Sequence, residues 1–559
     1  MPHVLGINAV FHDPSAALIG DGRIVAAAEE ERFTRRKHGK EPVAFSTWEL
    51  PERSARWCLE HAGVEPGRLD AVAYSYDPAL SEVPSGDVLA GTWEGLRTLF
   101  VERAPRFLAT ALPGLDPGRV RFVPHHRAHA ASAYLASGFE SCAVLTVDGR
   151  GERSSALLGR WRDGRLEMLA EQSLPHSLGL VYESLTDHLG FRRASDEFKV
   201  MALASYGRPR WLAEVRDAMH ATGDGGYVAK PLEWERFAPA VTGGEGLGSA
   251  HADLAASVQT QLEETLLELA AWLHERTGES RLAMAGGVAL NCVANSRLWR
   301  DGPFDEVWVH PAAGDAGTAL GAALYVAHEV GERMEPMTGA ALGRGWTAGE
   351  LSGWLDRGAL DYEHPRDVAE EAADTLAGNG VVAWFDGRAE FGPRALGHRS
   401  LLADPRDAGN LERLNDVKDR EQFRPVAPMV LDEHAGEIFD GGPLPSPYML
   451  FTHRVREEWL DRIPAVVHVD GTARVQTVNA EREPTVARLL RAFADRTGVP
   501  VLVNTSLNTA GRPMVDDPRD ALECFGSAPI DALVMGPFLL RRARMRATPR
   551  ENAPEVRAA

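Results

Sequence analysis

One pattern of apolar segments and turns occurs twice in the chain, and it restricts the fold more than any other feature. In the first copy, strands are predicted at 4–10, 16–19 and 24–28. In the second copy, they are predicted at 144–147, 155–158 and 166–170. Both copies have a polar turn after the first strand and an Asp-Gly hairpin turn before the third. Strand-turn-strand patterns are common, but the matched first turns favour duplication of a three-stranded meander.

The remaining sequence indicates helices and a second α/β unit. A helix is predicted at 253–276, where apolar residues recur every three or four positions. Residues 334–349 are irregular and rich in Gly, which is typical of a linker. Two helix-strand units follow and favour a mixed sheet. A chain of 559 residues is too long for one core, and we predict an α/β protein with domains 1–340 and 341–559.

Charge and composition exclude several classes of protein. The 80 acidic and 60 basic residues give a formal net charge of -20, which argues against a nucleic acid as the main partner. No apolar run has the length of a membrane span, and no signal-peptide pattern is present. We therefore expect a cytoplasmic protein without a membrane partner. The four cysteines lie far apart and predict neither a disulfide framework nor a thiolate zinc site.

Histidines at the start of an Ala-rich helix are candidate metal ligands. His125 and His129 would lie one turn apart on the same helix face, where two imidazoles can bind one ion. His126 with His129 is also geometrically possible, and packed helix-end histidines are the alternative. Asp148 follows a predicted strand and adds a carboxylate. A His-His-carboxylate set suits iron, manganese or zinc.

Glycine-rich turns predict a nucleotide cleft between the two copies. Asp315, a second candidate carboxylate, lies among glycines at a strand-to-helix junction, where helix N–H groups could face a phosphate. The candidate nucleotide-binding residues in these turns are Gly286, Gly287, Asn291 and Gly314. Each turn alone could serve close helix packing. Together, on a duplicated architecture, they favour a cleft.

Residues 386–424 are rich in charge. They hold eight basic and eight acidic residues, for which solvated ion pairs are the usual explanation. Arg394 and Arg424, however, each stand beside a proline in an apolar setting. A guanidinium held by a rigid turn can bind phosphate or carboxylate through two hydrogen bonds.

Ordered motifs along the whole chain resemble one enzyme family. They are FHDPSAAL, EEERFTRRKHG, HHRAHAASA, VDGRGE, SLGLVYESLTDHLGF, DEFKVMALASYG, GGVALNCVANS, WVHPAAGDAGTALGAAL, FGPRALGHRS, VKDREQFRPVAP, DGTARVQTV and NTSLNTAGRP. In this order they are similar to motifs of the O-carbamoyltransferases that include the nodulation-factor, cephamycin and nebramycin enzymes.

The resemblance implies a fold and a set of site residues in the N-terminal half. That half resembles the duplicated actin-like ATPase fold of the tRNA threonylcarbamoyl-transferase subunit. The metal of that family, iron, would be held here by His125, His129, Asp148 and Asp315. His12 falls where a base would take the proton of an acceptor hydroxyl, and Lys37 where a cation would stabilise negative charge.

In the C-terminal half, the resemblance is to a YrdC-like α/β domain that forms an adenylate. The residues that match motifs expected to hold carbamoyl phosphate and ATP are Arg394, Lys418, Arg424, Arg474, Asn504 and Ser506. Arg420 is a weaker candidate, because Asp419 and Glu421 could pair with it. A turn cap is the alternative role for Asn504 and Ser506.

The family reaction has two stages. Carbamoyl phosphate and ATP, accompanied by Mg²⁺, would give carbamoyl adenylate in the C-terminal domain, and the N-terminal cleft would transfer the carbamoyl group to a hydroxyl. We expect a specialised-metabolite acceptor, as in antibiotic biosynthesis, with a macrolactam polyketide favoured over an aminoglycoside. Trp234 and Phe237, within 219–248, are expected to form an apolar acceptor wall. The sequence leaves open whether the protein forms a homodimer.

Two other functions share part of this pattern. A tRNA threonylcarbamoyladenosine-type synthase would have both folds, but the acidic balance disfavours the basic RNA-binding face that it needs. A sugar kinase or simple ATPase would need only the N-terminal domain. It would leave the arginine motifs of the C-terminal half without a role.

Overall fold

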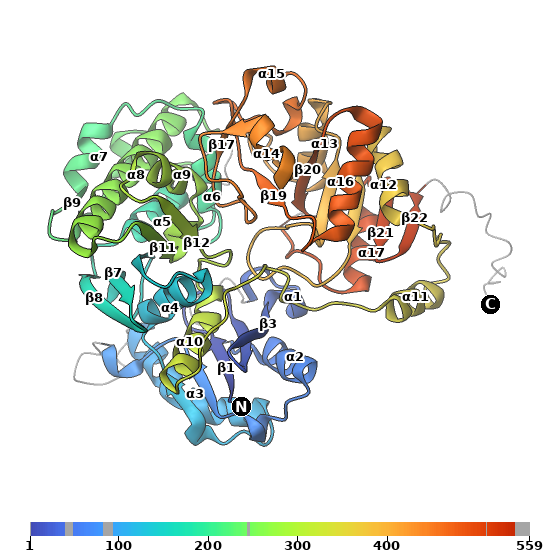
Figure 1. The fold of residues 1–559 in the computed structure, drawn as a ribbon. Coiled ribbons are helices and arrows are strands. Elements are labelled where there is room, and N and C mark those ends of the chain that lie inside the picture. The colour runs from blue at the N-terminus through green and yellow to red at the C-terminus, as the bar shows by residue number, and fades with distance from the viewer. Residues whose placement is uncertain (1, 40–48, 82–92, 243–245, 510, 543–559) are drawn as a thin grey trace, which may run out of the picture.

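The computed structural model describes residues 2–39, 49–81, 93–242, 246–509 and 511–542. Its N-terminal half contains two five-stranded sheets, coloured blue to green in Figure 1. The first has the order β3-β2-β1-β4-β5, with β1 (His3–Asn8), β2 (Ser15–Gly20), β3 (Arg23–Glu29), β4 (Ala71–Tyr74) and β5 (Val120–Phe122). The second has the order β12-β11-β6-β7-β8, with β6 (Cys142–Val147), β7 (Ser154–Arg162), β8 (Arg165–Ser173), β11 (Arg281–Ala285) and β12 (Glu306–Val309).

The two sheets have the same topology, which confirms the predicted duplication. In each, three consecutive strands form an antiparallel meander, and the first of them also begins a parallel run of three strands. The hairpin turns match as well. Asp21-Gly22 and Asp163-Gly164 all have positive φ, as a two-residue hairpin turn requires. The duplicated architecture of the N-terminal half therefore agrees with a local pattern that is present in the sequence.

Two helices between the sheets position the candidate site. They are α4 (His125–Ser137) and α10 (Ala316–Glu329), which pack on each other. Helix α10 also packs on strands of the first sheet, and α4 on strands of the second. Glycines permit the close approach, because a Cβ at Gly6 would overlap the Ala319 carbonyl and one at Gly321 would overlap the Ala128 carbonyl. The N-terminal ends of both helices therefore lie close to the ends of β1 and β6.

The other elements of the N-terminal half surround this centre. Its remaining elements are α1 (Glu31–Thr34), η1 (Lys37–Gly39), α2 (Glu52–Ala62), α3 (Trp93–Ala111), α5 (Leu178–His188), α6 (Glu197–Ala204), α7 (Leu212–Ala218), β9 (Met219–Ala221), β10 (Tyr227–Ala229), α8 (Ser249–Thr277) and α9 (Cys292–Asp301). The helix predicted at 253–276 is α8, and it packs on α6 and α9. Among the described residues, no helix combines the length and apolar character needed to cross a bilayer.

The C-terminal half is built on a mixed seven-stranded sheet, as predicted (Figure 1). Its order is β19-β15-β20-β14-β13-β21-β22, with β13 (Val382–Phe385), β14 (Arg399–Ala403), β15 (Ala427–Leu431), β19 (Gln476–Val478), β20 (Val501–Ser506), β21 (Ala532–Met535) and β22 (Phe538–Arg541). A small second sheet contains β16 (Phe439–Asp440), β17 (His453–Val455) and β18 (Thr472–Ala473). The helices are α11 (Ala348–Arg357), α12 (Val368–Ala377), α13 (Gly409–Val417), α14 (Asp432–Ile438), α15 (Glu457–Leu460), α16 (Pro484–Thr497) and α17 (Pro518–Ser527).

The two halves share buried contacts. Residues 330–347 join α10 to α11 without helix or strand, and the predicted boundary at 340 lies within this segment. Phe391 of the C-terminal half is part of the apolar core beside α4 and α10. The buried Arg32, at 3% exposure, pairs with Glu29 and Glu31 and donates to the Gly392 carbonyl at 2.8 Å. A charged, solvent-excluded contact therefore crosses from α1 to the C-terminal half.

Candidate functional site

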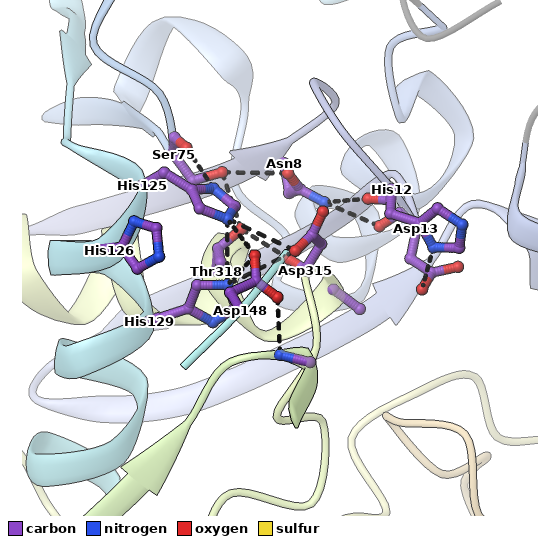
Figure 2. A network of polar contacts seen from close by, with 12 residues as sticks. Asn8, His12, Asp13, Ser75, His125, His126, His129, Asp148, Asp315 and Thr318 are labelled. Carbon is purple, nitrogen blue, oxygen red and sulfur yellow. Dashed lines mark hydrogen bonds and ion pairs between the residues drawn. The ribbon is translucent and has the colours of Figure 1, made fainter. Parts of the chain in front are cut away.

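Four predicted metal ligands converge because of where their elements begin and end. His125 is the first residue of α4, so it and His129 face the same side of that helix. Asp148 follows the last residue of β6, and Asp315 precedes the first residue of α10. Since α4 packs against α10, the two imidazoles and two carboxylates meet in the buried centre drawn in Figure 2.

The donor atoms of this centre lie at spacings that suit one ion. The Nε2 atoms of His125 and His129 are 3.1 Å apart. Asp148 Oδ2 is 3.4 Å from His125 Nε2 and 3.7 Å from His129 Nε2. Asp315 Oδ1 is 3.5 Å from both nitrogens. Ligand atoms about 2.1 Å from one ion lie roughly 3.0–3.4 Å apart at right or tetrahedral angles, so these four side chains fit a metal.

The charges of the centre are matched to each other. Burial disfavours every charged form, but the carboxylates raise the pKa of His125 well above its usual value. The imidazoles in turn hold the pKa of Asp148 well below its usual value, against the effect of burial. His125 Nδ1 faces the Ser75 carbonyl at 3.4 Å, which directs its Nε2 into the centre. Two nitrogens and two carboxylate oxygens suit iron, manganese or zinc alike.

His126 is buried but does not join this group. Its Nδ1 lies 3.2 Å from Ser154 Oγ, and it is not among the four residues whose donor atoms converge. Burial and the neighbouring His125 lower the pKa of His126 to about 3, so the ring is neutral. The structure therefore distinguishes the two histidine pairs that spacing left open. The group contains His125 with His129.

The glycine turns lie beside the centre. The backbone N–H of Gly287 donates to Asp148 Oδ1 at 2.8 Å, and Gly286 has φ 96° with no room for a Cβ against Val147. Gly314 lies in the turn before Asp315. Asn291 has another task, because its side chain caps α9 and exchanges hydrogen bonds with Gln259. Nucleotide binding by these residues stays a prediction.

A hydrogen-bonded chain joins the centre to the turn that carries His12 (Figure 2). Asn8, fully buried at the end of β1, donates to the carbonyls of His12 at 2.7 Å and Asp13 at 3.0 Å. Its own carbonyl accepts from Ser75 Oγ at 3.2 Å, and Ser75 Oγ also bonds Thr318 at 2.9 Å. His12 is thus fixed to the same framework that holds His125.

Lys37 and His38 approach this turn from η1. The Lys37 ammonium is 3.8 Å from Glu31 Oε2 and its side chain is 39% exposed. His38, the next residue, bonds Asp13 Oδ1 at 2.8 Å and Ser195 Oγ at 2.7 Å. The sequence reasoning missed Asp13 and His38. Both stand inside quoted motifs, directly after His12 and Lys37, and that adjacency was the available signal.

A second group in the C-terminal half consists of cations. They are Arg394, Lys418, Arg420, Arg424 and Arg474. Burial, together with the charges of neighbouring members, lowers the pKa values of Arg394, Lys418, Arg420 and Arg424. Burial and the charge of Arg474 lower the pKa of Arg394 to about 9, and burial with Arg424 does the same for Arg420. Within the described part of the chain, Nε of Arg394 and of Arg474 are buried without a hydrogen-bond partner. This cation cluster can receive an anion.

The ion pairs and hydrogen bonds around the cation cluster show which contacts expected from the sequence are formed. Glu421 pairs with Arg424 at 3.4 Å and with Lys199 at 2.7 Å, so it is not the partner of Arg420 that the sequence suggested. Lys418 Nζ donates to Ser506 Oγ at 3.0 Å. Arg420, Lys418 and Ser506 therefore belong to one cluster.

Asn504 lies at the edge of the cation cluster. Its amide donates to Gln476 Oε1 at 2.7 Å and to the Ala395 carbonyl at 3.1 Å. Its Oδ1 is buried and has no partner among the described atoms. The side chain thus presents an acceptor beside a cluster that otherwise offers donors.

Two family models match most of the chain. A model described as carbamoyltransferase N-terminus matches residues 3–106 and 108–324, and one described as carbamoyltransferase C-terminus matches residues 373–542. The chain belongs to the carbamoyltransferase family. Among its relatives are the protein sll1178 of Synechocystis, 38% identical over 97% of both chains, and nodulation protein NolNO of Sinorhizobium fredii, 39% identical over 96% of this chain and 80% of the relative. The 3'-hydroxymethylcephem-O-carbamoyltransferase of Amycolatopsis lactamdurans is 32% identical over 95% of this chain and 98% of the relative.

One helix of this carbamoyltransferase connects its two groups. Ser195, two residues before α6, contacts His38, while Phe198 within α6 lies under the Arg424 guanidinium at 4.6 Å. Lys199, one residue later, pairs with Glu421 at 2.7 Å. A single short segment therefore bridges the cation cluster and the turn beside the His125–His129–Asp148–Asp315 group.

The expected apolar acceptor wall is wrong for Trp234. Its indole is only 7% exposed, belongs to the core around α8, and donates to Ser184 Oγ at 3.0 Å. Phe237 packs against Trp211 at the edge of the same core. An aromatic residue among Gly and Pro was equally compatible with core packing, and packing is what these carbamoyltransferase residues do. Residues 243–245 of this region lie outside the described structure.

Proposed function

We propose that this protein is an ATP-dependent O-carbamoyltransferase that makes carbamoyl adenylate in its C-terminal half and consumes it in its N-terminal half. One observation carries the proposal. Two polar groups of opposite character occur in one chain: the buried His-Asp centre of His125, His129, Asp148 and Asp315, and the half-buried cation cluster. The segment from Ser195 into α6 connects the cation cluster to the turn beside the centre. A kinase or simple ATPase has no use for the second group.

The first stage suits the cation cluster. Water releases phosphate from carbamoyl phosphate and leaves carbamate. A carbamate oxygen then attacks the α-phosphorus of ATP, the bond to the β-phosphate bridge breaks, and pyrophosphate leaves with carbamoyl adenylate as the other product. Arg394, Lys418, Arg424 and Arg474, with Ser506 and Asn504 beside them, would bind the phosphate groups and stabilise the charge that grows on the leaving groups.

The second stage suits the turn that carries His12. The acceptor hydroxyl oxygen attacks the carbamoyl carbon, the bond to the adenylate oxygen breaks, and AMP leaves. His12 takes the hydroxyl proton, and Lys37 supplies positive charge to the reacting group. Because carbamoyl adenylate reacts with water, a short enclosed transfer between the halves protects it.

His125, His129, Asp148 and Asp315 would hold a divalent metal, for which we propose iron. When bound, the metal would supply positive charge to the nucleotide phosphate near Gly286, Gly287 and Gly314. Mg²⁺ would accompany ATP in the first stage. The described residues fit this ion by donor type and spacing, as the distances among the four side chains indicate.

The acceptor we propose is a hydroxylated specialised metabolite, with a macrolactam polyketide placed first and aminoglycosides second. A relative named for carbamoylation of a hydroxymethylcephem supports the small-molecule class. Transfer to such an acceptor would belong to antibiotic biosynthesis.

The test is incubation with ATP, carbamoyl phosphate and a panel of hydroxylated natural products, with tRNA as a further member. Mass spectrometry should find one added carbamoyl group on a small molecule, and pyrophosphate release should depend on carbamoyl phosphate. Formation of ADP in place of AMP and pyrophosphate would contradict the first stage. Carbamoylation or threonylcarbamoylation of tRNA alone would replace the proposed acceptor class.

A further inference from the structure

Asp13 lies between two imidazoles. Its Oδ2 is 3.0 Å from His12 Nδ1, and its Oδ1 is 2.8 Å from His38 Nδ1. The two rings lie 4.4 Å apart between centroids. The residues come from two segments, the turn between β1 and β2 and the turn η1, so this arrangement exists only in the folded protein.

Backbone conformation directs these side chains at each other. Asp13 has φ 43° and His38 has φ 62°, a region that residues other than glycine occupy rarely. Hydrogen bonds hold both positions. Asn8 donates to the carbonyls of His12 and Asp13, and Glu31 Oε2 accepts the His38 backbone N–H at 2.7 Å. Such backbone conformations persist where the surroundings enforce them, and they are concentrated at functional sites.

Hydrogen-bond chemistry fixes the protons of the group. Burial raises the pKa of Asp13, but the adjacent His12 and His38 hold it well below its usual value, so the group is a carboxylate. A carboxylate only accepts, and therefore Nδ1 of both rings must carry hydrogen. In its neutral form each ring then has its lone pair on Nε2. For His38, that lone pair accepts the hydroxyl hydrogen of Ser195.

We infer that Asp13 and His38 are positioning residues for His12, and that the three side chains act as one proton-handling unit in carbamoyl transfer. Asp13 fixes the tautomer that leaves His12 Nε2 able to take the acceptor proton, and it stabilises the imidazolium that results. His38 occupies the other carboxylate oxygen and prevents Asp13 from rotating away. Ser195 anchors His38 to the start of α6. The inference rests on the proposed function, because it assigns the base of its second stage.

The logic resembles the carboxylate-imidazole pair of serine proteases, with a second imidazole on the carboxylate. The substitution Asp13→Asn distinguishes a positioning role of Asp13 from a role in packing alone. The amide oxygen can accept from one ring, but the amide NH₂ must donate to the other, which forces that ring into the tautomer with hydrogen on Nε2. Size and shape hardly change.

The experiment compares Asp13→Asn, His38→Gln and His12→Ala with Asp21→Asn in the full-length protein. Asp21 is an exposed turn aspartate with φ 55° in the next hairpin, so it controls for the same substitution at positive φ. We expect Asp13→Asn to lower kcat of transfer roughly 10²–10⁴-fold with little change in acceptor KM. We expect about tenfold for His38→Gln, which retains one donor. Pyrophosphate release should be unchanged in all four variants.

Nitrogen-15 NMR of histidine-labelled protein supplies a readout that loss of packing would not produce. Resonances that vanish in His12→Ala and His38→Gln assign the two rings, and one of them should change tautomer in Asp13→Asn. Full transfer activity with unchanged tautomers in Asp13→Asn would overturn the inference and leave the proposed function intact if His12→Ala is inactive. Full transfer activity in His12→Ala would instead remove the base from the proposed function.

Metal analysis separates positioning from ion binding at the same three side chains, which also lie close enough to be ligands. Equal metal content in wild type, Asp13→Asn and His38→Gln supports the hydrogen-bonded unit. Loss of an ion from both variants would overturn it in favour of a second metal site.

Discussion

The His-Asp centre and the cation cluster handle buried charge in opposite ways. In the centre, two imidazoles face two carboxylates, so each group stabilises its neighbours. In the cation cluster, Arg394, Arg420 and Arg474 have mainly other cations nearby, and buried guanidinium nitrogens lack partners among the described atoms. The first group is arranged for an added cation and the second for an added anion. Substitutions in the two regions should therefore differ in how they change the stability of the substrate-free protein and its activity.

The largest expected effect is that of Arg394→Met, which should lower activity and raise stability. Pyrophosphate release should fall by about 10³-fold, because a phosphate contact is lost. The free energy of unfolding should nevertheless rise by about 1–2 kcal/mol, because a half-buried cation among cations, with its Nε solvent-excluded, is replaced by an apolar side chain. Urea denaturation without substrate measures the second quantity.

The control for this variant is Arg488→Met. Arg488 is 56% exposed and pairs with Asp367, so both activity and stability should stay near those of wild type. A substrate-free Arg394→Met protein that is markedly less stable than wild type would show that the cluster's cations are already compensated.

Adjacent histidines offer a matched pair for the other region. His125→Asn should remove the bound metal and lower transfer by about 10²-fold or more, with pyrophosphate release retained. His126→Asn, one residue away and equally buried, should keep the metal because its ring points to Ser154. Elemental analysis and the transfer assay give the two readouts. Retention of metal in both variants would reduce the centre to a packed ion pair.

Glu197, the first residue of α6, should make the free energy of unfolding depend on pH, an effect of intermediate size. Burial raises its pKa from 4.5 to about 7. The folded protein therefore binds a proton between these values that the unfolded chain does not, and stability from this group falls as pH rises from about 4.5 to 7. Glu197→Gln should be more stable than wild type by about 2 kcal/mol at pH 8 and similar at pH 4.5.

Denaturation curves at the two pH values test Glu197. Gln can still accept the Ala194 N–H that bonds the carboxylate at 2.7 Å, so the local fold is preserved. An equal stability difference at both pH values would point to packing in place of ionisation.

The smallest effect concerns Asn291. If its role is the observed cap of α9, Asn291→Ala should lower the free energy of unfolding by about 1 kcal/mol. Asn291→Asp, which can still cap the helix, should lose less. Transfer kinetics should be nearly unchanged in both, whereas a raised KM for the adenylate in both would assign Asn291 to the nucleotide.

The parts of the fold and the site that could be predicted from the sequence are those set by patterns among nearby residues. The Asp-Gly turns and the apolar runs around them indicated the two meanders, and the four-residue spacing indicated that His125 and His129 share a helix face. Side-chain contacts between residues distant in the sequence could not be predicted. Glu421 pairs with Arg424 and with Lys199, which is distant in sequence, so its partners could not be chosen from neighbouring residues alone. The contact of His38 with Asp13 likewise depends on a turn 25 residues away.

Arg32 has a consequence for how the two halves can move. Its guanidinium binds Glu31, which also holds the His38 backbone, and the Gly392 carbonyl, two residues before Arg394. Pulling the halves apart would leave Glu29 and Glu31 with Arg32 but would break its bond to the Gly392 carbonyl and the bond from the Gly392 N–H to Glu29, each of about 1.5–3 kcal/mol because one partner is charged. Wide hinge opening is therefore disfavoured, and molecules should enter and leave through smaller loop and side-chain rearrangements.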